Sequence, residues 1–124
     1  MAHILVLDDE PDAVLLLKRV LQCKDREVAT FTIEEEAIAF ARSHQIDLAI
    51  LDVRLRRMNG IEVLRELKEI HPAMHALILT GFPTAETEKK AAALGADDYC
   101  TKPIDIQDLE RKVTSIIGRK DKDF

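Results

Sequence analysis

Three aspartates follow two short apolar segments and could form a charged site. Asp8 and Asp9 directly follow the apolar run at 3–7, and Asp52 directly follows the run at 48–51. Three carboxylates within several ångströms repel one another, and a single lysine would not neutralise them. A hard divalent cation would, and Mg²⁺ suits one or two carboxylates together with phosphate oxygens and water. A carboxylate in such a site can attack phosphorus and become an aspartyl phosphate.

A hydroxyl group and an ammonium group could complete this site. Thr80 ends the apolar segment at 76–80, and Lys102 follows the segment at 98–101. Both side chains can donate hydrogen bonds to phosphoryl oxygens while the metal stabilises charge in the transition state. Taken singly, each candidate residue also has an ordinary explanation as a helix cap, a loop acid or a solvated turn residue. Their joint placement after four different apolar segments favours a common site.

Apolar and amphipathic segments alternate along the whole chain. The expected strands are residues 3–7, 27–31, 48–51, 76–80 and 98–101, and the expected helices are residues 11–21, 33–43, 59–70, 84–94 and 105–117. This alternation predicts an α/β fold, with a parallel sheet, five helices on its two faces and right-handed crossovers. Five strands suit the doubly wound, flavodoxin-like order 2-1-3-4-5, whose site lies beyond the carboxyl ends of the strands. We expect one domain at 1–118 and a flexible tail or linker stub at 119–124.

The composition predicts a soluble cytoplasmic protein. Of the 124 residues, 47% are hydrophobic and 33% are charged, and the net charge is −5. The acidic balance disfavours direct nucleic-acid binding, and no apolar run is long enough to span a membrane. The amino terminus also lacks the pattern of a secretory signal. Cys23 and Cys100 lie in apolar context and are expected to be reduced core residues.

Four short motifs occur in a fixed order along the chain. They are Leu7-Asp8-Asp9-Glu10, Asp52 with Met58-Asn59-Gly60, Leu79-Thr80-Gly81, and Gly95-Ala96-Asp97-Asp98-Tyr99 leading into Lys102-Pro103. No single motif is specific, but the ordered set is. Over residues 3–117 the chain resembles the receiver domains of bacterial two-component response regulators, in particular the chemotaxis-regulator-like members of that family.

The resemblance implies a Mg²⁺-dependent signalling switch rather than an enzyme, with intrinsic phosphotransfer and autodephosphorylation activity. Asp52 would accept a phosphoryl group from a sensor histidine kinase or a histidine phosphotransfer protein. Asp9 and Asp52 would bind the metal directly and Asp8 mostly through water. The backbone carbonyl of Arg54 would complete the ligands that the protein supplies.

The resemblance also implies how phosphorylation is sensed. Thr80 and Lys102 would contact the phosphoryl group, and the Lys102–Pro103 peptide bond is expected to be cis. Thr80 would turn toward the phosphoryl group and vacate space that Tyr99 can fill. The output surface is then expected on the face built from residues 84–94, 98–101 and 105–117.

Partners follow from the same resemblance. The output surface would act on an attached output domain or a downstream target protein, and a phosphorylation-dependent dimer is compatible with it. Contacts with nucleic acid or a membrane are not expected of this domain.

The loops over the site have features of their own. Residues 55–58 read Leu-Arg-Arg-Met, where the family often has a proline, and this difference bears on partner specificity. Arg54 and Phe82 follow Asp52 and Thr80 by two residues. We expect both side chains to cover the site and slow hydrolysis of the phosphoryl group, because hydrolysis needs an in-line water.

Other classes of protein fit less well. A haloacid-dehalogenase-type phosphatase needs a second acid two residues after its nucleophile, where this chain has Arg54. A flavodoxin needs a hydroxyl- and glycine-rich loop after the first strand, and the acidic loop here would repel a phosphate. A dinucleotide-binding fold lacks its glycine motif. The remaining alternative is a phosphorylation-independent, receiver-like interaction module, which a beryllofluoride adduct in the presence of Mg²⁺ would exclude.

Overall fold

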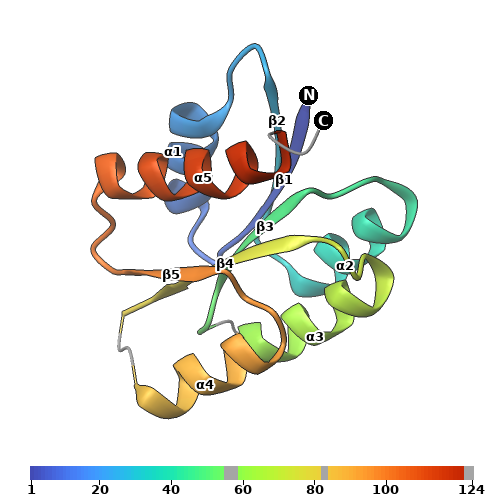
Figure 1. Ribbon diagram of the computed structural model, residues 1–124, viewed down its shortest axis with the longest axis vertical. Helices are drawn as coiled ribbons and strands as arrows, with labels where there is room; N and C mark the ends of the chain where they lie inside the picture. The colour runs from blue at the N-terminus through green and yellow to red at the C-terminus, as the bar shows by residue number, and fades with distance from the viewer. Residues whose placement is uncertain (55–58, 82–83, 122–124) are drawn as a thin grey trace.

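Five strands and five helices alternate along the chain in the computed structural model, which describes residues 1–54, 59–81 and 84–121 (Figure 1). The strands are β1 (Ala2–Leu7), β2 (Arg26–Phe31), β3 (Leu48–Asp52), β4 (His75–Thr80) and β5 (Asp98–Thr101). The helices are α1 (Pro11–Leu21), α2 (Glu34–Ser43), α3 (Gly60–Ile70), α4 (Ala85–Ala93) and α5 (Ile106–Asp121). The alternation expected from the sequence is confirmed.

The strands form one parallel sheet in the order β2-β1-β3-β4-β5, which confirms the doubly wound arrangement. Leu7 of β1 lies beside Leu51 of β3, so the residues that follow these strands emerge at the same edge. Thr80 at the end of β4 lies beside Thr101 at the end of β5. The register therefore brings the ends of all four strands that carry candidate residues to one side of the sheet.

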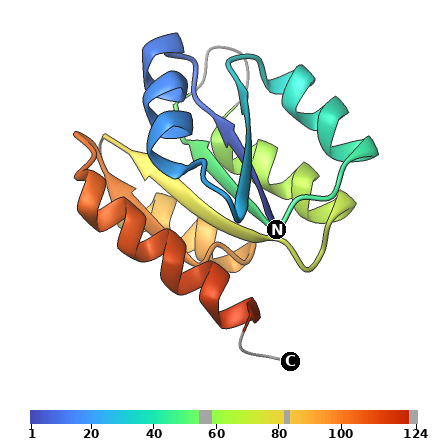
Figure 2. The same cartoon turned by 90° about the horizontal axis from the view of Figure 1, so that it is seen from above.

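Helices cover both faces of the sheet, with α1 and α5 on one face and α2, α3 and α4 on the other (Figure 2). Successive residues of a strand point to opposite faces, so β1 contributes to two core layers. Ile4 and Val6 pack with Leu17 of α1, whereas Leu5 and Leu7 join the cluster beneath α2 and α3. Burial on both faces is why β1 and β3 are continuous apolar runs.

Local sequence signals explain where several helices begin and end. Pro11 begins α1 at a position where a missing N–H costs nothing. The Asn59 side chain accepts a hydrogen bond from the backbone N–H of Ile61 at 2.7 Å and caps α3. Thr84 caps α4 in the same way, and Gly95 takes a positive φ of 93° just after that helix.

Two expectations about single segments are wrong. Cys23 is exposed, because it lies in the polar turn after α1, whose last buried residue is Leu21; Cys100 on β5 is buried as expected. Helix α5 continues to Asp121, past the helix end expected at residue 117, while the expected domain boundary at 118 stays a prediction. The lone Gly118 lowers helix propensity by only about 1 kcal/mol, too little to end a helix that is packed on the sheet.

Within the described part of the chain, no helix has both the length and the apolar character needed to cross a membrane.

Candidate functional site

The three aspartates expected to form a site meet at the carboxyl edge of the sheet. One carboxylate oxygen from each of Asp8, Asp9 and Asp52 lies within 4.8 Å of the others. Asp8 and Asp52 are buried, and Asp9 is partly exposed at the opening. Hard oxygen ligands at this spacing, with one side open to solvent, are the donor set that Mg²⁺ takes in proteins.

Lys102 links two of these aspartates. Its Nζ atom donates to Asp8 Oδ2 and to Asp52 Oδ2, each at 3.0 Å. Burial would lower the pKa of Lys102, but the hydrogen bonds and charges of the two carboxylates outweigh burial, so its pKa is raised. One ammonium group still faces three carboxylates, and the site keeps an excess of negative charge that a divalent cation would balance.

Asp52 shows the effect of this excess. Burial raises its pKa above the ordinary 3.8, and the neighbouring Asp8 charge raises it further, against the opposing effect of Lys102. The backbone N–H of Arg54 donates to Asp52 Oδ1 at 3.1 Å and also favours the ionised form. Oδ1 and Oδ2 of Asp52 therefore have different donors, one from its own loop and one from Lys102.

The backbone around Asp52 is held from both sides. Val53 donates to the carbonyl of Leu79 at 3.0 Å, and Gly60 donates to the carbonyl of Val53 at 2.9 Å. A Cβ atom at Gly60 would lie 2.1 Å from the carbonyl oxygen of Asp52, so only glycine fits there. The sequence predicted Gly60 only as the start of α3. Its close approach to the Asp52 backbone was not predicted, although its position shortly after Asp52 could have indicated it.

The other predicted contacts to phosphate come from β4 and from the residues after β5. Thr80 is buried at the end of β4, and its carbonyl accepts a hydrogen bond from the backbone N–H of Lys102 at 2.7 Å. The Lys102–Pro103 peptide bond is cis, as the resemblance implied. Phe82, like Met58, lies outside the described residues, whereas Arg54 is exposed beside Asp52.

Tyr99 lies on β5, at the surface between α4 and α5, with 38% of its area exposed. Glu88 of α4 lies near its hydroxyl, and interaction with this carboxylate raises the pKa of the phenol. A largely apolar cavity of about 260 Å³ lies between α4 and the sheet, and Thr80, Ala91 and Tyr99 are among its lining residues. The cavity thus extends from Thr80, which is expected to contact the phosphoryl group, to Tyr99 at the surface.

Comparison with known proteins identifies the class. The model of the response regulator receiver domain family matches residues 4–114, so the chain belongs to that family. Among solved structures, a CheY-like receiver domain protein from Methanospirillum hungatei superposes with a TM-score of 0.93 at 27% identity, covering 100% of this chain and 99% of that one. A receiver domain protein from Clostridium thermocellum has a TM-score of 0.86 at 34% identity, with 98% of both chains covered.

Curated relatives are longer regulators. The chain is 37% identical to the transcriptional regulatory protein ZraR of Salmonella typhimurium, over 93% of this chain and 26% of that protein. It is 36% identical to the alkaline phosphatase synthesis transcriptional regulatory protein PhoP of Bacillus subtilis, over 95% of this chain and 49% of that protein. This receiver chain spans between a quarter and a half of the length of these relatives.

Proposed function

We propose that this receiver domain takes a phosphoryl group on Asp52 in a Mg²⁺-dependent reaction and acts as a signalling switch. The meeting of Asp8, Asp9 and Asp52, with Lys102 bridging Asp8 and Asp52, is the observation that supports the proposal. An Asp52 oxygen would attack the phosphorus of a phosphohistidine. As the new P–O bond forms, the P–N bond breaks, and the imidazole nitrogen leaves with the electron pair and takes up a proton.

Each residue of the site has a role in this reaction. Asp9, Asp52 and the carbonyl of Arg54 would hold Mg²⁺, and Asp8 would hold it through water. When bound, the metal neutralises charge on the carboxylates and on the transferring phosphoryl group. Lys102, which now bridges Asp8 and Asp52, would donate to a phosphoryl oxygen instead.

The conformational change would be transmitted from Thr80, at the phosphorylation site, to Tyr99 at the surface. The Thr80 hydroxyl would turn toward the phosphoryl group, and the Tyr99 ring would move into the cavity that both residues border. The conformational change would then appear on the face formed by α4, β5 and α5. Autodephosphorylation, by attack of water on the aspartyl phosphate, would return the domain to its starting state.

The partners follow from the family. A sensor histidine kinase or a histidine phosphotransfer protein would supply the phosphoryl group. The α4–β5–α5 face would transmit the change to an output domain or a downstream target protein, or to a second copy in a phosphorylation-dependent dimer. The longer regulators to which the chain is similar support an attached output domain.

Mass spectrometry of the intact protein tests the proposal. Incubation with acetyl phosphate and Mg²⁺ is expected to add the mass of one phosphoryl group, and chelation of the metal is expected to prevent it. Asp52→Asn should abolish the addition. A full level of phosphorylation in Asp52→Asn would overturn the assignment. Failure of the wild type to form a Mg²⁺–beryllofluoride adduct would favour the phosphorylation-independent interaction module.

A further inference from the structure

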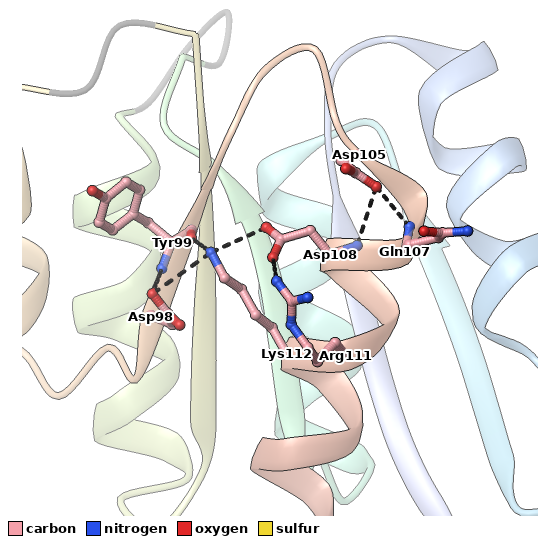
Figure 3. A network of polar contacts seen from close by, with 7 residues as sticks. All are labelled: Asp98, Tyr99, Asp105, Gln107, Asp108, Arg111 and Lys112. Carbon is pink, nitrogen blue, oxygen red and sulfur yellow. Dashed lines mark hydrogen bonds and ion pairs between the residues drawn. The ribbon is translucent and has the colours of Figure 1, made fainter.

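Lys112 of α5 contacts Tyr99 in two ways. Its Nζ atom lies 5.6 Å from the centroid of the Tyr99 ring, within the range of a cation–π interaction. The same atom donates a hydrogen bond of 2.6 Å to the backbone carbonyl of Tyr99 (Figure 3). The lysine therefore joins α5 to β5 through both the ring and the backbone of one residue.

The position of the Lys112 ammonium group is itself defined by two carboxylates. Asp108, one turn earlier on α5, lies 3.3 Å from Nζ, and Asp98 of β5 lies 3.9 Å away. Asp98 also accepts a hydrogen bond of 2.8 Å from the backbone N–H of Tyr99. Since 25% of the Lys112 side chain is exposed, the ammonium group is held beside Tyr99 more firmly than a fully solvated lysine would be.

Glu88 contacts the other end of the Tyr99 side chain from α4. Glu88 and Tyr99 line the same cavity, which also borders Thr80, and the Glu88 carboxylate lies near enough to the phenol hydroxyl to raise the pKa of Tyr99. The ring thus has Lys112 of α5 at its face and the Glu88 carboxylate of α4 near its hydroxyl. Both interactions are present in the conformation in which the Tyr99 ring lies at the surface, outside the cavity.

We propose that Lys112 and Glu88 restrain the Tyr99 ring outside the cavity and thereby hold this receiver in its unphosphorylated conformation. The inference rests on the proposed function, because it concerns the equilibrium on which phosphorylation of Asp52 acts. A ring that moves into the cavity moves away from the ammonium group. The restraint therefore opposes the switch and lowers the fraction of molecules in the phosphorylation-competent conformation.

Removing the restraint should raise that fraction before any phosphoryl group is added. A phosphoryl analogue binds more tightly when more of the protein already has the competent conformation, in proportion to the population gained. An exposed cation–π contact would alter the population by about threefold. We therefore expect Lys112→Met to bind beryllofluoride, with Mg²⁺, about threefold more tightly than wild type, and Glu88→Ala to change the affinity in the same direction.

The chain provides a direct optical readout of this ring. Tyr99 is the only tyrosine and there is no tryptophan, so intrinsic fluorescence excited above the phenylalanine band reports on Tyr99 alone. Without phosphoryl analogue, acrylamide should quench this fluorescence less in Lys112→Met and Glu88→Ala than in wild type, because the ring spends more time in the cavity.

Two control variants match the two substitutions. Arg111 pairs with the same Asp108 on the same helix, and Arg111→Met removes that ion pair. Glu86 of α4 pairs with Lys90 at 3.0 Å and lies on the same helix as Glu88. Arg111→Met and Glu86→Ala are expected to behave like wild type in both quenching and beryllofluoride affinity.

The possible results separate this inference from the proposed function. Equal quenching and equal affinity in wild type, Lys112→Met and Glu88→Ala would overturn the restraint, as would the same change in the control variants. If no protein bound beryllofluoride but quenching still fell in the two test variants alone, the phosphoacceptor role would fail and the restraint would stand. If Lys112→Met does not fold, Glu88→Ala decides the question by the same two measurements.

Discussion

Asp52 carries a negative charge that its surroundings do not fully stabilise in the absence of metal. Burial raises its pKa above 3.8, so the folded protein holds a proton on Asp52 at pH values where the unfolded chain has lost it. The stability that this group contributes is present below the unfolded pKa and is lost as the pH rises through the folded pKa. Ionised Asp52 therefore destabilises the metal-free protein at neutral pH.

Asp52→Asn should consequently make the metal-free protein more stable at pH 7, by roughly 1 kcal/mol. The gain should shrink as the pH falls through the raised pKa of Asp52 toward 3.8. Urea unfolding in EDTA at several pH values measures this. Asp25→Asn, at an exposed position in the turn after α1, is the control and should change little. An equal stability of Asp52→Asn and wild type across the pH range would contradict the argument.

Asp9 and Glu10 are neighbours with different expected roles in metal binding. Asp9 contributes an oxygen to the aspartate cluster, whereas Glu10 is exposed and not part of it. Asp9→Ala is therefore expected to weaken Mg²⁺ binding by tenfold or more, and Glu10→Ala to leave it nearly unchanged. The measurement is the rise in melting temperature with Mg²⁺ concentration, which reports binding to the folded state. Similar curves for the two variants would remove Asp9 from the ligand set.

Arg54 is predicted to lengthen the lifetime of the phosphoryl group, together with Phe82, which lies outside the described residues. The Arg54 side chain is exposed and its backbone N–H donates to Asp52, so a guanidinium group on this loop is expected to reach phosphoryl oxygens. The Arg54→Ala/Phe82→Ala double variant should lose its phosphoryl group several-fold faster than wild type, a barrier change of about 1 kcal/mol. Decay is followed in Mg²⁺ after removal of the donor. Arg42→Ala on α2 serves as control, and equal decay in all three proteins would refute the prediction.

At the scale of elements, the start of α3 is packed against the end of β3 without space for a side chain. A Cβ atom at Gly60 would lie 2.1 Å from the Asp52 carbonyl oxygen and 2.9 Å from Val53 Cα. Backbone atoms cannot move aside as a flexible side chain can, so Gly60→Ala should displace the loop that carries Asp52.

Gly60→Ala is expected to destabilise the protein by about 3 kcal/mol or more and to slow phosphorylation. Gly81→Ala is the matched control, because among the described residues other than its chain neighbours no atom would lie within 4 Å of a Cβ atom there. Chemical denaturation gives the stability of each variant. If Gly60→Ala and Gly81→Ala lower the free energy of unfolding by the same amount, the close approach of α3 to β3 does not explain why glycine is at position 60.

At the scale of the whole molecule, burial differs strongly between the described elements. Strand β3 is buried throughout, whereas Ala91 is the one buried residue of α4, all nine residues of which are described. Regions with little buried area open at a lower free-energy cost. A helix that is weakly held at the output face can shift when Thr80 and Tyr99 change position.

Hydrogen exchange should follow this distribution. Amides of β1, β3 and β4 are expected to exchange slowest, and those of α4 fastest among the helices. Addition of Mg²⁺ and beryllofluoride should alter exchange mainly in α4, β5 and α5, in addition to the loops around Asp52. A change confined to those loops would argue against transmission to the α4–β5–α5 face.

Much of this protein could be predicted from its sequence, because local patterns depend on neighbouring residues alone. The continuous apolar runs indicated strands buried on both faces, and β5 begins and ends where the sequence predicted. Pro11, Asn59 and Gly95 marked helix ends by their backbone preferences. Strand order then followed from the alternation of elements, and with it the edge at which the aspartates meet.

Only the tertiary structure decided how residues from distant segments are matched. The bridge from Lys102 to Asp8 and Asp52, and the position of Lys112 against Tyr99, depend on distances between elements that no local pattern encodes. The exposure of Cys23 and the end of α5 were predicted wrongly, because the position of a turn and the last turn of a helix depend on the folded chain around them. Periodicity determines which elements form and which faces they bury, whereas side-chain contacts across the sheet arise only once the elements are packed.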